Sequence, residues 1–387
     1  ILAKNPGKIP ELAYVNLICT DKTGTLTTGI MTPKVMVNGA CEDIMNDKDS
    51  VAAGLIKNNV CLNNSADYDA DGNITGGNSI DRAVLGLYSK GNCRIVKESF
   101  AVKNRLPFSS ENKYSAIEVA SLTADAQMTL YKGAPEKLIQ RCSYYIANSG
   151  EVKQFTDSDR KAMESYIKGL TEKAMRCIAL TMSDFFKEDE LPKDMTLLGV
   201  IGVVDPLREE VPDAVKIANE AGIQVIEITG DCLAKAVAAE AGIYHPWDKA
   251  ITNDEFEAMS DNEVKEIIPK LRVISRCSPN TKLRLVTLAQ EIGMSVAMTG
   301  DGVNDSPALK KADVGFGMES GSDVAKEASD IILTDNNFAS TVKATELGRT
   351  FMHNIMMFLE FQLPINISLL ILSMIYPVIS GGAALLA

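Results

Sequence analysis

The sequence predicts an α/β protein with a doubly wound parallel sheet, an inserted α+β domain and an apolar C-terminal helix. After about residue 199, short apolar runs alternate with helical segments, which is typical of a parallel sheet. The stretch from about 34 to 202 lacks this alternation and contains Asn- and Gly-rich turns. No charged residue occurs from Phe361 to Ala387. A length of 387 residues accommodates two or three domains.

We expect four segments along the chain. Residues 1–33 and 203–345 form the sheet domain, residues 34–202 the insertion, and residues 346–387 a stalk and a transmembrane helix. The run Val15 to Cys19 predicts the first buried strand. Its partner strands are expected only after the insertion, at 198–204, 223–228, 272–277, 295–298 and 313–316, with the last run ending the sheet. Helices are expected at 212–221, 233–241 and 281–292.

Composition excludes several classes of protein. A net charge of −12 argues against a nucleic-acid binder, because phosphate contacts require clustered Lys and Arg. The eight cysteines are scattered, with no C-x-x-C pair and no nearby histidine, so we expect reduced cytoplasmic thiols and neither a zinc site nor a disulfide framework. The two histidines, His245 and His353, disfavour histidine-based catalysis.

The uncharged C-terminal run is long enough to cross a bilayer, which takes roughly 20 apolar residues. The alternative is a buried helix of a soluble core. Gln362, Asn366 and Ser373 fall on one helical face, and polar groups inside a membrane segment indicate a helix bundle or an ion path. The chain ends without a soluble segment, so we expect that it is part of a larger protein.

Three of the expected strands end in acidic, glycine-containing turns. Each turn alone is compatible with an ordinary surface loop, but the carboxyl ends of neighbouring parallel strands meet at one edge of a sheet. Clustered carboxylates repel one another, and a divalent cation relieves that repulsion. Oxygen ligands alone favour Mg²⁺. The turns are Asp21-Lys-Thr23-Gly, Thr229-Gly230-Asp231 and Thr299-Gly-Asp301-Gly-Val-Asn304-Asp305.

Two side chains at this edge have a predicted chemical role. Asp21 follows its strand directly, and a carboxylate there can act as a nucleophile that forms an aspartyl-phosphate. Lys282, at the start of a predicted helix, can neutralise charge on a transferred group. The alternative for Lys282 is a solvated surface lysine.

The run D-K-T-G-T-L-T from Asp21 resembles the phosphorylation signature of the P-type ion-transporting ATPases, whose fold is of the haloacid-dehalogenase type. The segment M-T-G-D-G-V-N-D-S-P-A-L from Met298 resembles a motif of the same family. The resemblance implies that Asp21 is phosphorylated from ATP, and that Asp21, Asp301 and the Thr23 carbonyl hold Mg²⁺. It also implies contacts to the phosphoryl group from Thr229, Gly230, Lys282 and Asn304, with Asp305 behind them.

Thr23 stands where many phosphatases of this fold carry an acid/base aspartate. Without that aspartate, attack of water on the aspartyl-phosphate is slow, which suits an intermediate that persists.

The insertion resembles the nucleotide-binding domain of the same family. The segment K-G-A-P-E from Lys132 and the segment P-F-S-S-E-N-K that ends at Lys113 carry the match. An aromatic ring and cations suit adenine and a triphosphate, although a phenylalanine such as Phe108, taken alone, is more often a core residue. The residues implied at the nucleotide site are Asp81, Phe108, Lys113, Lys132, Arg176 and Asp231.

The segment from Phe358 to Ser368 is similar to the fifth membrane helix of plasma-membrane-type calcium pumps. Asn366 matches an ion-liganding asparagine, and Leu369 replaces a glutamate of the two-site pumps, which implies one calcium per cycle. The resemblance thus implies the catalytic headpiece of an ATP-driven cation pump, with calcium as the expected ion. The resemblance also implies that the partners are ATP, the cation, a lipid membrane and the rest of the pump, and that the catalytic domains lie in the cytoplasm.

Three alternatives remain open from the sequence. One is a P-type pump for another cation, such as H⁺ or Na⁺/K⁺. Another is a soluble phosphatase of the haloacid-dehalogenase type. The last is a nucleotide-binding or scaffold module without catalysis.

Overall fold

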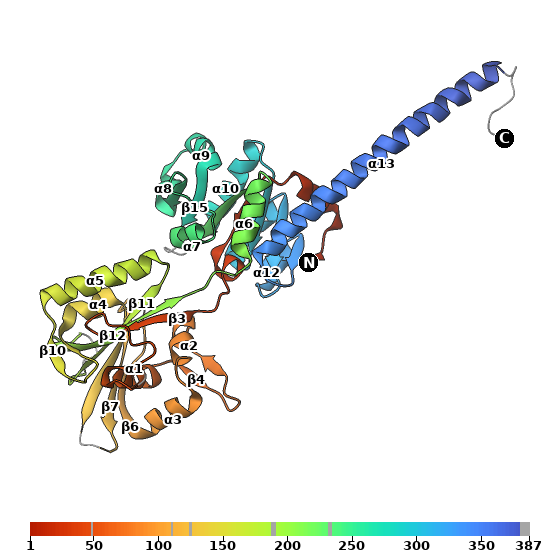
Figure 1. The fold of residues 1–387 in the computed structure, drawn as a ribbon. Helices are drawn as coiled ribbons and strands as arrows, with labels where there is room; N and C mark the ends of the chain where they lie inside the picture. The colour runs from red at the N-terminus through yellow and green to blue at the C-terminus, as the bar shows by residue number, and fades with distance from the viewer. Residues whose placement is uncertain (48, 110, 124–125, 187–190, 231–233, 380–387) are drawn as a thin grey trace. The chain divides into compact units, whose positions relative to one another are not determined.

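The computed structural model describes residues 1–47, 49–109, 111–123, 126–186, 191–230 and 234–379. The chain divides into two compact units (Figure 1). We call Ile1–Leu26 with Arg208–Ala387 the parallel-sheet unit, and Thr27–Leu207 the inserted unit.

Within the described residues, the parallel-sheet unit has one eight-stranded sheet, in the order β1-β18-β17-β16-β2-β13-β15-β14. The neighbouring strands pair in parallel except β1, which runs antiparallel to β18 at the edge. The strands are β1 Leu2–Ala3, β2 Leu17–Thr20, β13 Gln224–Thr229, β14 Lys249–Thr252, β15 Leu271–Ser275, β16 Val296–Gly300, β17 Val314–Met318 and β18 Ile331–Leu333.

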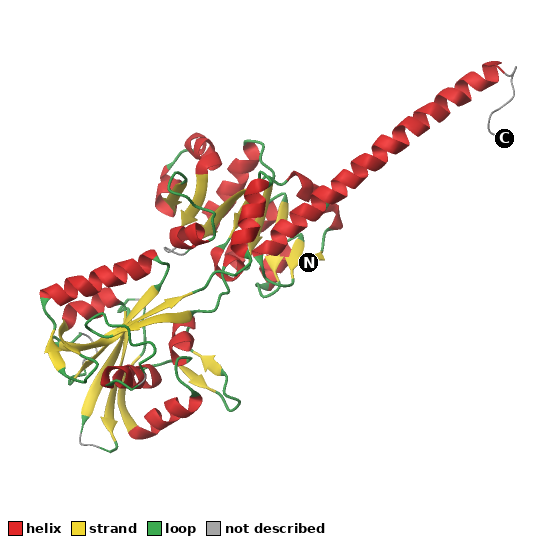
Figure 2. Cartoon of the chain, viewed as in Figure 1, coloured by secondary structure: helices red, strands yellow, loops and turns green. Residues whose placement is uncertain are grey.

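Helices surround this sheet (Figure 2). They are α6 Val211–Glu220, α7 Ala234–Glu240, α8 Asn253–Ala258, α9 Asp261–Ile267, α10 Pro279–Glu291, α11 Ser306–Lys311, α12 Asp323–Ala328 and α13 Phe338–Ile379, with 3-10 turns at Pro6–Lys8, Pro10–Tyr14, Ile268–Lys270 and Val303–Asp305. All four residues of β2 are buried, as expected for a strand covered on both faces.

The order of the strands places β2 at a switch point. β13 lies on one side of β2 and β16 on the other, so the three strands predicted to end in acidic turns are neighbours. Ligands of open α/β sheets bind beyond the carboxyl ends of the strands at such a point. The predicted doubly wound sheet is confirmed.

Several expectations about the sheet were wrong. β17 is not the last strand, because β18 follows it, and neither β1 nor β14 was expected. The run 198–204, expected as a strand of this sheet, lies in β12 (Met195–Val204) of the inserted unit. The strands β1, β14 and β18 lie at or next to the edges of the sheet, and they have two, four and three residues. A run of three or four residues carries too little periodicity to be recognised in a sequence.

Within the described part of the inserted unit, an eight-stranded, mainly antiparallel sheet has the order β10-β9-β12-β11-β8-β7-β6, with β3 also paired to β12. A separate hairpin of β4 Ala66–Tyr68 and β5 Ile74–Gly76 lies beside it. The sheet strands are β3 Thr32–Val37, β6 Phe100–Leu106, β7 Tyr114–Ser121, β8 Gln127–Gly133, β9 Cys142–Ile146, β10 Val152–Gln154, β11 Arg176–Ser183 and β12 Met195–Val204. The helices are α1 Val51–Leu62, α2 Ser79–Leu85, α3 Lys90–Ser99, α4 Pro135–Leu138 and α5 Asp157–Glu172, with a 3-10 turn at Ile139–Arg141.

The sheet of the inserted unit has a separate hydrophobic core on each face, because its side chains alternate between the faces along each strand. Ile117 and Leu130 pack with α1, α2 and α3 on one face, whereas their neighbours Ala116 and Tyr131 pack with α4 and α5 on the other. Successive side chains of a strand point to opposite faces, so both faces of this sheet must be covered.

The first and last residues of the inserted unit lie next to each other. Thr27 forms an antiparallel bridge with Leu207, and Asp205 accepts hydrogen bonds from Thr27 Oγ1 (2.6 Å) and Gly29 N (2.8 Å). The expected boundaries at 33/34 and 202/203 lie inside β3 and β12, and the compact units meet at 26/27 and 207/208. The apolar run of β12 continues past residue 202, and its pairing with β3 binds both strands to the insertion.

The long helix α13 has two different halves. Its first turns are buried, with Phe338 and Thr341 0% exposed, whereas the side chains from Phe361 to Tyr376 are largely exposed. Among the described residues, this is the one helix long and apolar enough to cross a membrane. It continues through Pro364, and the expected boundary at 345/346 lies within it.

Gly199, in β12, tests how tightly the inserted unit is packed. A Cβ atom there would lie 2.3 Å from Val37 O and 2.8 Å from Ile56 Cδ1. We expect Gly199→Ala to lower the free energy of unfolding by about 1–3 kcal/mol, because either neighbour must move. Thermal unfolding of the complete chain measures this.

Gly54→Ala is the matched control. Gly54 lies inside α1, and no atom is within 4 Å of its Cβ position, so alanine should raise the free energy of unfolding by about 0.5–1 kcal/mol through its helix propensity. Equal effects of the two substitutions would contradict the packing at Gly199.

Candidate functional site

Asp21 directly follows β2, where the chain turns sharply away from the sheet. Its backbone N donates to Thr299 O in the adjacent strand β16 (3.4 Å). The turn Lys22–Leu26 that follows contains Gly24 at φ +74°, and a Cβ atom on Gly24 would lie 3.1 Å from Asp301 Oδ2. A glycine there allows the positive φ and the close approach of the Asp301 carboxylate.

Lys282 links two carboxylates at this edge of the sheet. Its Nζ donates to Asp21 Oδ1 (3.1 Å) and Asp305 Oδ1 (2.6 Å). The lysine lies in the first turn of α10, which begins at Pro279 after the N-cap Ser278, a typical start for a helix. Lys282 is 5% exposed, so the surface-lysine alternative is wrong.

Asp301 and Asp305 complete an acidic cluster with Asp21. One oxygen from each of the three carboxylates lies within 4.8 Å of the others. Asp305 also accepts from Gly302 N at 3.0 Å. Gly300 has no space for a side chain, because a Cβ atom there would lie 2.5 Å from the Asp305 Cβ.

Burial and like charges disfavour ionisation of Asp21 and Asp301. Burial raises the pKa of Asp21 to about 6; the Lys282 ammonium opposes that rise, and Asp305 and Asp301 add to it. Burial and the neighbouring Asp305 also raise the pKa of Asp301. Burial alone would lower the pKa of Lys282, but Asp21 and Asp305 outweigh it and raise that pKa, so the ammonium stays charged.

The donor set of the cluster fits a magnesium ion. Lys282 offsets only one of the three carboxylate charges, and the ligand atoms are all oxygens, which Mg²⁺ prefers. The three carboxylates could therefore hold such an ion.

The other residues predicted at this edge have varied surroundings. Thr23 and Asn304 are exposed. Thr229 is 3% exposed at the end of β13, and its carbonyl accepts from Cys277 N (2.9 Å). Gly230 follows it, with no atom within 4 Å of its Cβ position. Asp231 lies outside the described residues.

The inserted unit contains a cavity of about 490 Å³. This volume is in the range of small-molecule sites. Five of the six residues expected to bind nucleotide line it, although they are up to 95 positions apart in the sequence: Asp81, Phe108, Lys113, Lys132 and Arg176.

Pairing of β7 with β8 brings two of the motifs together. Tyr114 is opposite Gly133, and Ala134 N donates to Lys113 O (2.9 Å). A Cβ atom on Gly133 would lie 2.5 Å from Lys113 O. The glycine of K-G-A-P-E is therefore required for the close approach of the strand that begins after Lys113.

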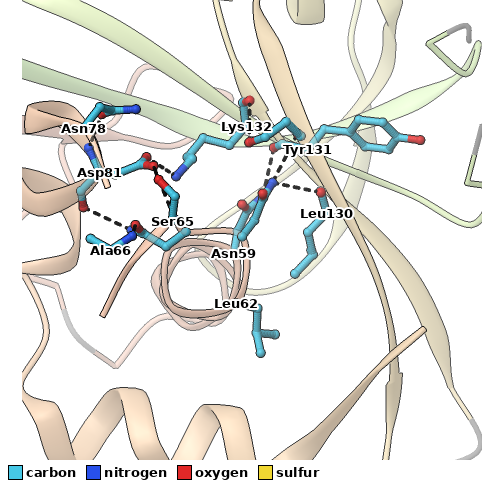
Figure 3. A network of polar contacts seen from close by, with 12 residues as sticks. Asn59, Leu62, Ser65, Ala66, Asn78, Asp81, Leu130, Tyr131 and Lys132 are labelled. Atoms are coloured by element: carbon cyan, nitrogen blue, oxygen red, sulfur yellow. Dashed lines mark hydrogen bonds and ion pairs between the residues drawn. The ribbon is translucent and has the colours of Figure 1, made fainter. Parts of the chain in front are cut away.

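Lys132 and Asp81 form a buried ion pair in the cavity wall (Figure 3), with Nζ to Oδ1 at 2.5 Å and both side chains 8% exposed. Burial alone would raise the pKa of Asp81, but Lys132 and Ser65 donate to its carboxylate and lower that pKa. Burial lowers the pKa of Lys132, and Asp81 opposes this. The sequence predicted both residues at the nucleotide site, but it predicted neither their ion pair nor Ser65, which donates to Asp81 through its Oγ and N.

Asn366, the residue expected at the ion site, is exposed on α13 and accepts a hydrogen bond from Gln362 Nε2 (3.1 Å). The two side chains lie on one face of the helix, as their spacing predicts.

Residues 51–210 match the family model described as P-type ATPase, cytoplasmic domain N, and residues 284–344 match the haloacid dehalogenase-like hydrolase model. The chain is similar over 96% of its length, at 34% identity, to "Calcium-transporting ATPase 8, plasma membrane-type" of Arabidopsis thaliana. The chain belongs to the P-type ATPases. It holds the nucleotide-binding (N) and phosphorylation (P) domains of that family and is a catalytic headpiece of haloacid-dehalogenase type.

This P-type ATPase chain is also similar to calcium-transporting ATPases of two other organisms. They are "Calcium-transporting ATPase 1" of Lactococcus lactis, 35% identical over 92% of the chain, and "Calcium-transporting ATPase PAT1" of Dictyostelium discoideum, 34% identical over 95%. The chain spans 37%, 41% and 34% of the length of the three relatives.

Adding Mg²⁺ to this P-type ATPase should raise its unfolding temperature, because a cation bound only in the folded state stabilises that state. We expect Asp301→Asn to remove this response. Without Mg²⁺, Asp301→Asn should unfold a few degrees above the wild type, because the raised pKa of Asp301 means that its ionised form opposes folding near pH 7.

Asp323→Asn is the control for this experiment, since the Asp323 side chain is fully exposed on α12. It should keep the wild-type response to Mg²⁺. A full response in Asp301→Asn would show that the ion binds elsewhere.

Proposed function

We propose that the chain is the catalytic part of an ATP-driven calcium pump and that MgATP phosphorylates it on Asp21. The observation that carries the proposal is the cluster beyond β2, where Asp21, Asp301 and Asp305 lie together and the Lys282 ammonium pairs with Asp21 and Asp305. Calcium as the transported ion is supported by the names of the three similar proteins, which are all calcium-transporting ATPases.

In the proposed reaction, an Asp21 carboxylate oxygen attacks the γ-phosphorus of ATP. The new O–P bond forms as the bond from the γ-phosphorus to the bridging oxygen breaks, and ADP leaves with that electron pair. Lys282 offsets negative charge on the transferred group, and Asp305 fixes the ammonium through their 2.6 Å contact. Thr229, Gly230 and Asn304 are the proposed donors to the phosphoryl oxygens.

Asp21, Asp301 and the Thr23 carbonyl are the proposed ligands of Mg²⁺. When bound, the ion supplies the positive charge that Lys282 alone does not provide against three carboxylates and a phosphate. The chain's own contribution is to hold the carboxylates together before ATP arrives, through the turn at Gly24 and the first turn of α10.

Thr23 favours a pump over a phosphatase. It is the second residue after Asp21 and carries no acid or base, so nothing at that position activates water against the aspartyl-phosphate. The intermediate then lasts long enough to be coupled to movement of an ion.

The cavity of the inserted unit is the proposed ATP site. Phe108, 54% exposed at its edge, offers a ring for adenine. Lys113 and Arg176 supply cations for the triphosphate, and Asp231 is a further proposed contact. Asp81 acts through Lys132, since both of its carboxylate oxygens already accept hydrogen bonds within the chain.

We propose that α13 crosses a lipid membrane, with Asn366 as a ligand of the transported calcium. Transport then depends on further parts of a pump, because the chain spans only about two fifths of its relatives' length. The seven described cysteines are free thiols, which supports a cytoplasmic location of both catalytic units.

Asp21→Asn should abolish phosphorylation while leaving ATP binding within about twofold of wild type, because the ATP cavity lies in the other unit. The complete pump that carries this chain is labelled in membranes with radioactive ATP and Mg²⁺, quenched in acid, and treated with hydroxylamine. Labelling that persists in Asp21→Asn would refute the nucleophile.

The same labelling, repeated with Ca²⁺, Na⁺, K⁺, Mn²⁺ or a chelator, tests the ion. Phosphoenzyme that requires Ca²⁺ in wild type, and that needs a higher Ca²⁺ concentration after Asn366→Ala, supports the calcium pump. Dependence on another cation would keep the mechanism and replace the ion. Rapid loss of the label in every ion would favour a phosphatase.

Lys132→Ala or Phe108→Ala should weaken ATP binding about tenfold or more, because each removes a contact of the proposed site. Labelling of Asp21 by acetyl phosphate should persist. Phe185→Ala is the control, since Phe185 is a 71% exposed aromatic of the same unit outside the cavity. Equal loss of labelling from ATP and acetyl phosphate would contradict the division into two sites.

A further inference from the structure

The end of α1 contacts β8, the strand that carries Lys132 (Figure 3). Asn59 Nδ2 donates to Tyr131 O (3.0 Å) in β8 and to Thr181 O (3.3 Å) in β11. Asn63 Nδ2 donates to Leu130 O (3.1 Å) and Ser115 O (3.2 Å). Two buried asparagines thus fix the backbone just before Lys132.

The residues that follow α1 hold Asp81. Asn64 Nδ2 donates to the Asp81 carbonyl (3.1 Å). Ser65 donates twice to Asp81 Oδ2, from its backbone N (3.3 Å) and from Oγ. Asn78, the N-cap of α2, accepts from Asp81 N (2.8 Å). The Asp81 side chain is therefore held on one oxygen by Ser65 and on the other by Lys132.

We infer that Ser65 is a positioning residue for nucleotide binding, a role that rests on the proposed ATP site. It fixes the Asp81 carboxylate, which in turn holds the Lys132 ammonium in the cavity wall. Lysine has a flexible four-carbon stem and three donors, and Asp81 accepts only one of them. The remaining donors are then available to acceptor atoms of a nucleotide.

The terminal torsion of a carboxylate has only a weak intrinsic preference. Without the Ser65 hydroxyl, the Asp81 carboxylate therefore rotates more freely. The buried Lys132 then has a less well-placed counter-charge, and part of the energy of nucleotide binding is spent in ordering it.

Ser65 offers a clean substitution because it is exposed, whereas Asn59, Asn63 and Asn64 are buried. Removing its hydroxyl leaves no cavity in the core. Threonine at this position keeps the hydroxyl and adds only a methyl group on an exposed side chain.

The test measures ATP affinity in the full chain, solubilised in detergent. We expect Ser65→Ala to raise the Kd for ATP about three- to tenfold through loss of a hydrogen bond to a charged group, and Ser65→Thr to restore it. Ser89→Ala is the matched control: Ser89 is an exposed serine of the same unit that caps α3 and does not line the cavity. It should leave the Kd unchanged.

A double substitution separates positioning from general stability. In a Lys132→Ala background, Ser65→Ala should cause no further loss, because it acts through Lys132. Wild-type affinity in Ser65→Ala, additive losses in the double variant, or failure of Ser65→Thr to restore binding would each overturn the inference. If wild type binds no ATP, or Lys132→Ala binds as wild type does, the proposed nucleotide site itself fails.

Discussion

Mutual repulsion of Asp21, Asp301 and Asp305 is the constraint on which the architecture of the parallel-sheet unit depends. Side-by-side parallel strands direct their carboxyl ends to one place, and acidic residues there cannot avoid one another. One buried ammonium, Lys282, counteracts the repulsion only partly. The fold thus keeps an excess of negative charge in a partly buried site, and such a site attracts cations.

In the inserted unit, by contrast, the buried charges at the cavity are balanced. Among the described residues Lys132 has one carboxylate partner, Asp81, so their charges cancel in the absence of a ligand. A balanced pair suits the recognition of a ligand that must be bound and released, because little net charge has to be desolvated. An unbalanced cluster suits chemistry in which charge builds up during the reaction. The division of the chain into two units separates these two electrostatic tasks.

The acidic cluster at the edge of the parallel sheet could be predicted from the sequence, because it depends on local sequence patterns. Asp21 and Asp301 each follow an apolar run that is long enough to identify as a strand, and parallel pairing then brings them together. The cavity of the inserted unit was predicted only by family resemblance, since the register that joins Lys113 to Gly133 depends on long-range antiparallel pairing. Ser65 carried no sequence signal, because an exposed serine beside a turn is common.

The bridge between Thr27 and Leu207 brings the two ends of the inserted unit together, so the unit is a cassette with adjacent ends. Two strands in register are separated by only about 5 Å, so a short turn could close the host chain if the cassette were removed. A gene segment that encodes such a cassette can be gained, exchanged or lost at one loop without disturbing the host sheet. The evolution of a chain with two units of this kind can therefore consist of one insertion event rather than the gradual remodelling of one domain.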